Sequence, residues 1–92
     1  MNSFKVIGNF NVTVKKKIHT LTNIEVGGSL IVTEQCEGLE KLILKGKIKI
    51  KGDILCKMPQ GCDLVVDASS FEVGGKTDGF NAIDAKESHT IV

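Results

Sequence analysis

Apolar residues recur at every second position over most of this chain, in pairs that flank a glycine or two small residues. Four units of this kind align, each with two apolar pairs: Phe4/Val6 and Phe10/Val12, Ile24/Val26 and Leu30/Val32, Leu42/Leu44 and Ile48/Ile50, and Leu64/Val66 and Phe71/Val73. A period of two with many β-branched and aromatic residues predicts half-buried β-strands. We therefore expect an all-β protein.

The spacing of the units predicts how the strands pair. Phe4, Ile24, Leu42 and Leu64 follow one another at intervals of 20, 18 and 22 residues. A repeat of about 20 residues is typical of one turn of a β-solenoid or a leucine-rich repeat, in which stacked turns share one core. The sequence therefore predicts a short parallel β-solenoid of about four turns, with a leucine-rich-repeat-like form included, in which these four residues form one column.

The same strands also fit a second architecture. An antiparallel β meander or small sandwich would use Gly8-Asn9, Gly27-Gly28 and Gly52-Asp53 as hairpin turns. Local turn signals do not separate the two folds. The regular spacing favours the solenoid.

The segments between the units are less regular. Residues 18–23, 33–38 and 55–62 would form a third side of each turn, with inward-facing residues at Leu21, Cys36, and Cys56 or Met58. After residue 75 the alternation is lost. We therefore expect residues 1–75 to form the solenoid and residues 76–92 a C-terminal cap or tail.

The stretch CEGLEKLILKGKIKIKGDILCKMPQGCDLVV resembles the BspA-type leucine-rich repeats of bacterial surface proteins. The residues that follow the order of that repeat are Cys36, Leu39, Leu42, Leu44, Ile48, Ile50, Gly52, Cys62 and Leu64. The stretches VGGSLIV and IKGDIL are also similar to the polymer-forming bactofilins, which are stacked β-helices. Both resemblances imply a scaffolding or binding role, and neither implies catalytic residues.

Composition is typical of one small soluble domain. The 92 residues are 41% hydrophobic and 25% charged, with a net charge of +1. No apolar run is long enough for a membrane span or a secretory signal, and three cysteines form no disulfide pattern. We expect a cytoplasmic protein with reduced thiols and no membrane partner.

The most distinct surface feature is a row of lysines. Lys45, Lys47, Lys49 and Lys51 alternate with Gly46, Ile48 and Ile50, and Lys41 and Lys57 lie at the margins. In a regular strand the four central lysines would share one face, suited to phosphates or to an acidic protein surface. The other interpretation is a solvated face whose lysines prevent pairing with neighbouring chains.

No motif indicates catalysis or a bound metal. Cys56 and Cys62 have no histidine nearby in sequence, and the carboxylates show no paired spacing. We therefore expect no enzymatic activity, no cofactor and no metal.

The sequence thus favours a non-enzymatic module for protein interaction or assembly, of which a small phage-type inhibitor docking on another macromolecule is one form. Because a stack of turns leaves strand edges at its ends, we also expect self-association, most simply as a two-fold homodimer. The alternative function is binding to a nucleic-acid backbone through the lysine face 45–51.

Overall fold

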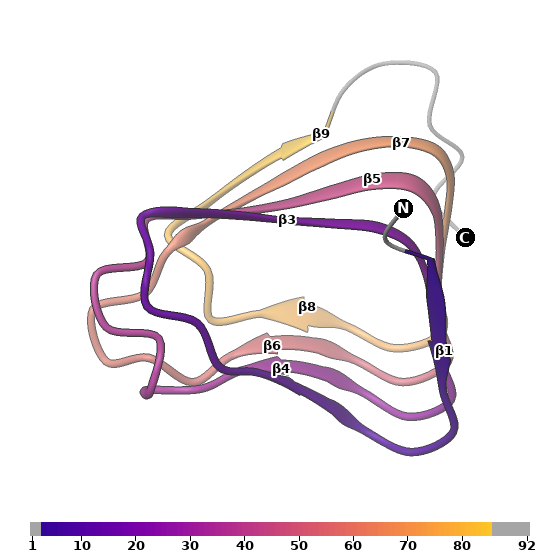
Figure 1. Ribbon diagram of the computed structural model, residues 1–92, viewed down its shortest axis with the longest axis horizontal. Coiled ribbons are helices and arrows are strands. Elements are labelled where there is room, and N and C mark those ends of the chain that lie inside the picture. Colours follow the sequence, from indigo (N-terminus) through magenta and orange to yellow (C-terminus); the bar gives the residue numbers. More distant parts are fainter. Residues whose placement is uncertain (1–2, 86–92) are drawn as a thin grey trace.

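The chain folds into nine β-strands arranged in two parallel sheets in the computed structural model, which describes residues 3–85 (Figure 1). The strands are β1 (Phe4–Val6), β2 (Phe10–Val12), β3 (Ile18–Val26), β4 (Leu30–Val32), β5 (Lys41–Ile50), β6 (Ile54–Cys56), β7 (Asp63–Val73), β8 (Thr77–Asp78) and β9 (Ala82–Ala85). One sheet has the order β1-β3-β5-β7-β9, and the other has the order β2-β4-β6-β8.

Every pair of neighbouring strands is parallel. The predicted β-solenoid of about four turns is therefore confirmed, and the antiparallel meander or sandwich is wrong. The described residues contain no helix, and so none that could span a membrane.

Each turn of the stack has three strand-bearing sides, because β3, β5 and β7 bend and contribute to two of them (Figure 1). We call them the upper, right and lower sides, after their places in Figure 1. The upper side consists of residues 18–22, 41–45 and 63–67 with β9, the right side of β1 with residues 24–26, 48–50 and 71–73, and the lower side of β2, β4, β6 and β8. Loops close each turn on the remaining side.

The register corrects the predicted columns. Ile24 pairs with Ile48, whereas Leu42 pairs with His19 and Leu64. The predicted column that joined Ile24 to Leu42 is therefore wrong. Its physical cause is the three-sided turn, because Gly46 lies at the bend inside β5 and not at the corner between two strands.

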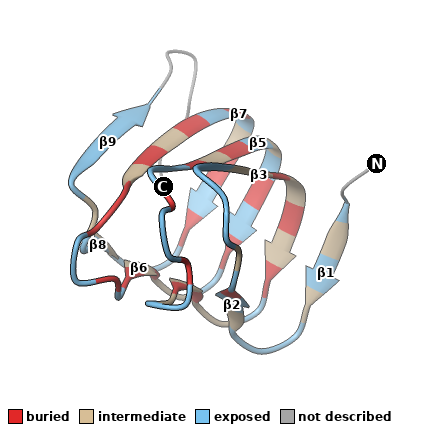
Figure 2. Cartoon of the chain, turned by 60° about the vertical axis from the view of Figure 1, so that its left-hand side comes forward, coloured by how far each residue is buried: buried red, intermediate tan, exposed pale blue. Residues whose placement is uncertain are grey.

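The core fills the space between the three sides. Buried residues alternate with exposed or intermediate ones along β5 and along most of β7, and β3 carries buried residues among intermediate ones (Figure 2). Of the residues expected to point inward from the less regular segments, all four are buried: Leu21, Cys36, Cys56 and Met58. No strand pair could bury these side chains alone, so the stacking of turns supplies the hydrophobic stabilisation.

Consecutive turns approach closely at the corner between the right and lower sides. There the Gly28 N–H donates to the Gly8 carbonyl over 3.0 Å. Side-chain oxygens extend this ladder, since Asn9 Oδ1 accepts the Ser29 N–H over 2.8 Å and Ser29 Oγ accepts the Asp53 N–H over 3.0 Å. A Cβ atom on Gly28 would collide with Asn9 Oδ1. The close approach of the two turns therefore requires glycine here.

The predicted tail is partly described. Residues 77–85 supply β8 and β9, the last strand of each sheet. Residues 86–92 lie outside the described residues, and the division of the chain at residue 75 stays a prediction.

Two glycines of neighbouring turns give a matched test of the corner. A Cβ atom on Gly27 would collide with the backbone oxygen of Ile7, whereas one on Gly8 meets nothing within 4 Å. We expect Gly27→Ala to lower the free energy of unfolding by about 1–3 kcal/mol, because the backbone must shift. Gly8→Ala should change it by less than about 0.5 kcal/mol. Urea unfolding followed by circular dichroism measures both, and equal stability of the two variants would contradict the proposed packing.

Candidate functional site

The lysines of the predicted binding face lie on two sides of the molecule. All six are exposed: Lys41, Lys45, Lys47, Lys49, Lys51 and Lys57. Between Lys45 and Lys47 the strand bends, because Gly46 adopts a φ of 74° and the register with β7 shifts after it. Lys45 consequently belongs to the upper side and Lys49 to the right side. The four central lysines point outward, as expected, but the bend at Gly46 distributes them over two sides of the molecule instead of one flat surface.

Carboxylates flank the lysines in the neighbouring strands. On β7, Asp63 lies beside Lys41, Asp67 beside Lys45 and Glu72 beside Lys49. On β3, Glu25 lies beside Lys49 and forms an ion pair with Lys5 of β1, with 3.7 Å between Nζ and Oε2. Lys5, Glu25, Lys49 and Glu72 thus form a column across the right side in which the sign of the charge alternates, and which we call the charge column.

The charge column limits what the lysines can bind. Adjacent strands lie about 4.8 Å apart, so Lys41, Lys45 and Lys49 each have a carboxylate residue at the paired position of β7, whereas Lys47 lies beside Ser70. A shallow groove of about 450 Å³ beside the column is lined by both signs of charge, including Lys47 and Glu72. The lysine row is therefore not a continuous positive track.

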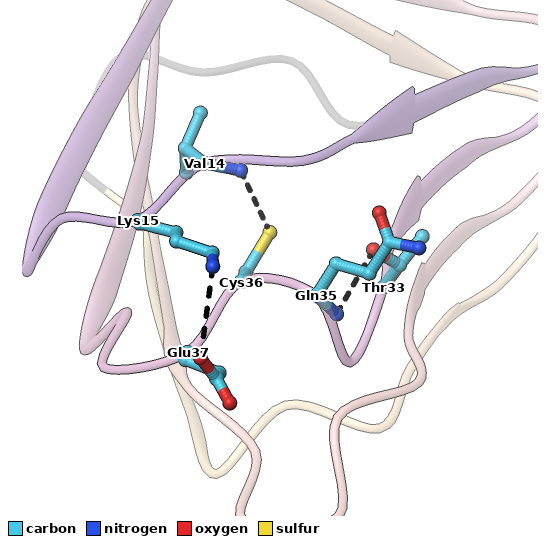
Figure 3. A network of polar contacts seen from close by, with 6 residues as sticks. All are labelled: Val14, Lys15, Thr33, Gln35, Cys36 and Glu37. Atoms are coloured by element: carbon cyan, nitrogen blue, oxygen red, sulfur yellow. Dashed lines mark hydrogen bonds and ion pairs between the residues drawn. The ribbon is translucent and has the colours of Figure 1, made fainter.

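The cysteines are structural groups of the core. Cys36 Sγ donates to the Val12 carbonyl over 3.0 Å and accepts the Val14 N–H over 3.3 Å, which joins two turns at the loop side (Figure 3). The Sγ atoms of Cys56 and Cys62 lie 3.9 Å apart inside the core as free thiols. Among residues 3–85 no group of three or more His, Cys, Asp or Glu side chains converges on a possible metal position.

The first turn leaves one end of the core partly uncovered. Phe4 and Phe10 start core columns on the right and lower sides, yet both are only half-buried, with ring centroids 5.1 Å apart. A notch of about 690 Å³ separates these rings from the edge of β3 and includes Ile18 and His19 in its lining. Ile18 is 53% exposed, and Ile7 beside the corner is 90% exposed.

Among residues 3–85, the last turn has no strand over the outer edge of its upper side. Ile83 of β9 ends the column formed by His19, Leu42 and Leu64, but Ile83 is 53% exposed whereas Leu42 and Leu64 are fully buried. Phe80 packs against the core and covers part of this end. Both ends therefore present core-column residues next to strand edges.

The sequence predicts strand edges at the ends of the stack but does not indicate which residues mark them. Ile7, Ile18 and Ile83 carry no distinct local signal, because alternation reports which face of a strand a residue occupies and not which turn is the last. Only the order of the strands in each sheet identifies them.

His19 is a core-column residue in the part of β3, residues 18–22, that pairs with β5 but not with β1. Its Nδ1 atom is buried and has no hydrogen-bond partner among residues 3–85. Burial, and then the positive charge of Lys16, lowers the pKa of His19 below its ordinary value. The neutral imidazole is therefore the form that the fold favours.

The geometry places the chain among parallel β-solenoids. Comparison with known proteins adds no family to this assignment, because no protein family, curated protein or solved structure matches the chain.

The thiols provide a test of the structural role of the cysteines. Burial, followed by the neighbouring Cys56 thiol, raises the pKa of Cys62 to about 12, and the thiolate is the reactive form. At pH 8 we expect an aromatic disulfide reagent to modify the thiols of the native protein on the order of 100-fold more slowly than those of the protein in denaturant. Absorbance of the released thiolate measures both rates. A native thiol that reacts as fast as a free cysteine would contradict this role.

His19 predicts a dependence of stability on pH. Its pKa is lower in the folded state than the value of about 6.5 expected in the unfolded chain, so the unfolded chain binds more protons. The free energy of unfolding should therefore fall as pH drops below about 6.5. Denaturant titrations at a series of pH values measure this slope.

Two variants test the cause of this slope. His19→Leu should flatten it, and Lys16→Ser should reduce it only partly, because burial remains the larger cause of the lowered pKa. If His19→Leu kept the wild-type slope, another group would be responsible.

Proposed function

We propose that this protein is a non-enzymatic module that binds a protein surface, or another copy of itself, through the strand edges at the ends of its stack. The observation that carries the proposal is that the terminal strands of both sheets have a partner on one edge only among residues 3–85. Backbone N–H and C=O groups on a free strand edge are a template for pairing with another chain. The exposed side chains of Ile18 and Ile83 add apolar surface next to these edges.

The stacked core supports a binding role because it holds these edges rigidly. The central columns are fully buried, for example Leu42 with Leu64 and Val26 with Ile50. A preformed edge loses little conformational freedom on binding, which favours association. One form of this proposal is a small inhibitor of phage type that docks on a macromolecule. We place it in the cytoplasm because its three cysteines are free thiols, which persist in a reducing compartment.

The resemblances noted in the sequence belong to the same proposal. Of the residues shared with BspA-type repeats, eight are buried in the core: Cys36, Leu39, Leu42, Leu44, Ile48, Ile50, Cys62 and Leu64. The glycine corners shared with bactofilins, Gly27-Gly28 and Gly52, lie where turns meet. Both resemblances therefore rest on positions that stacked turns need.

Binding of a nucleic-acid backbone is a second candidate. The exposure of all the lysines in residues 41–57 favours it, whereas the flanking carboxylates Asp63, Asp67 and Glu72 weigh against it. The two candidates predict different dependence on salt, because release of counterions makes phosphate binding fall steeply with ionic strength.

The proposed function is tested by capture of proteins from an extract of the source cells on the immobilised chain. The two variants compared with wild type are Asn11→Pro, on the edge strand β2, and Lys49→Ser, on the central strand β5. We expect Asn11→Pro to reduce capture at least about 10-fold, since proline blocks pairing at that edge, and Lys49→Ser to leave it unchanged.

The result that would overturn the proposal is equal capture by all three proteins. Fluorescence titration with single- and double-stranded nucleic acid at low and high salt tests the second candidate. Tight binding with a steep loss at high salt would favour that candidate instead.

A further inference from the structure

Residues 3–85 make a whole number of turns. Starting at β1, the strands occupy the right, lower and upper sides in that order four times, and the fourth round ends at β9 on the upper side (Figure 1). The next strand of a continued stack would lie on the right side, which is where β1 begins the chain. The position that follows β9 in the repeat is therefore the position that β1 occupies, so a second copy placed there would continue the stack in the same order of sides.

We propose that copies of this chain stack head to tail, with the first turn of one copy on the last turn of another, so that both parallel sheets continue across the junction. This inference rests on the proposed function and names its partner as a second copy of the chain. In the junction, β1 of one copy would lie beside the end of β7 of the other, β2 beside β8, and the edge of β3 beside β9.

The charge column favours this arrangement over a two-fold dimer. It begins with Lys5 at the first turn and ends with Glu72 at the last turn. Head-to-tail stacking sets Lys5 of one copy beside Glu72 of the other and continues the alternation. A two-fold contact between two first turns would bring Lys5 near Lys5, and one between two last turns would bring Glu72 near Glu72, so that like charges repel.

The backbone groups at the two ends of the lower side are also complementary. The Phe10 N–H donates to the Ser29 carbonyl over 2.9 Å, so the N–H and C=O groups of Asn11 point the other way, out of the first turn. The Ile54 N–H donates to the Lys76 carbonyl over 2.8 Å, so the groups of Thr77 point out of the last turn. Parallel pairing of β2 with β8 would satisfy both sets.

The apolar surfaces match on the upper side. By continuation of the column that joins His19, Leu42, Leu64 and Ile83, Ile83 of one copy would contact His19 of the next. The exposed strand β9 would then fill the notch of about 690 Å³ beside β3. The junction would bury Ile83, which is 53% exposed in the single chain, and would set Ala82 beside the exposed Ile18.

Such a junction does not close on itself. Contacts between two different surfaces of the same chain generate open filaments unless the rotation between copies completes a ring. The inference therefore predicts filaments of the pure protein that lengthen with concentration.

Blocking one end at a time provides the decisive test. Asn11→Pro removes an outward N–H at the first turn, and Thr77→Pro removes one at the last turn, while neither removes a hydrogen bond between the strands of residues 3–85. By sedimentation velocity over a wide range of concentration, we expect wild type to form a series of growing species and each variant alone to remain monomeric. An equimolar mixture of the variants should stop at a species of two chains, because only one productive junction remains.

Reversal of the terminal charges tests the same junction without proline. Lys5→Glu and Glu72→Lys should each weaken association by about 10-fold, and the double variant should restore it, because Glu at position 5 then faces Lys at position 72 of the next copy. Within one chain the double variant creates only like-charge neighbours, so restoration cannot arise there. Lys45→Glu, on the central strand, should leave association unchanged. Circular dichroism confirms that each variant is folded, and if a proline variant unfolds, the charge reversals decide.

Three results would overturn the inference. They are a wild-type protein that stays monomeric at every concentration, a Thr77→Pro variant that dimerises alone through its first turn, and an Asn11→Pro variant that dimerises alone through its last turn. A different outcome separates the inference from the proposed function. If the pure chain is monomeric, but wild type captures another protein from the extract that Asn11→Pro does not capture, head-to-tail stacking is wrong and the proposed function stands.

Discussion

The close contact between successive turns at their corners is the constraint on which this fold depends. Parallel strands of consecutive turns lie about 4.8 Å apart, and the chain must keep that spacing where it changes direction. Gly28, Gly52 and Gly75 meet this condition, since a Cβ atom on any of them would collide with the turn before it. The same approach lets Asn9, Ser29 and Asp53 accept backbone N–H groups of the following turn. Corner geometry and register are thus set together.

Once the turns are in register, most of the reactive groups are committed to structure. The Cys36 thiol bonds to the backbone of the preceding turn, and Cys62 is buried with a raised pKa. What remains for recognition is the outer surface, where lysines and carboxylates alternate from strand to strand, and the two ends. The ends differ from the outer surface because only there do core columns and backbone hydrogen-bonding groups lie together without a covering strand among residues 3–85. This contrast is the reason for proposing the ends as the binding surfaces.

The error in the predicted columns has a local cause. Gly46 separates two apolar pairs of β5 in the same way that Gly27 and Gly28 separate β3 from β4, so the pattern alone treats both as corners. In the structure Gly46 has a positive φ and bends one continuous strand, whereas Gly27 and Gly28 end one. Period-two alternation continues across either kind of glycine and therefore does not distinguish them.

The sequence alone favoured a parallel β-solenoid of about four turns, because stacked turns bury regularly spaced apolar pairs, but it left an antiparallel arrangement open until the strand pairing was known. It also determined which lysines point outward, because side chains alternate across a strand. The tertiary structure decided the three-sided turn, the pairing of Ile24 with Ile48 and the match between the first and last described turns. It also decided which lysines have a carboxylate beside them, namely Lys41, Lys45 and Lys49. These features depend on which residues meet across neighbouring strands. Register is a property of the whole stack, and no single segment of the chain encodes it.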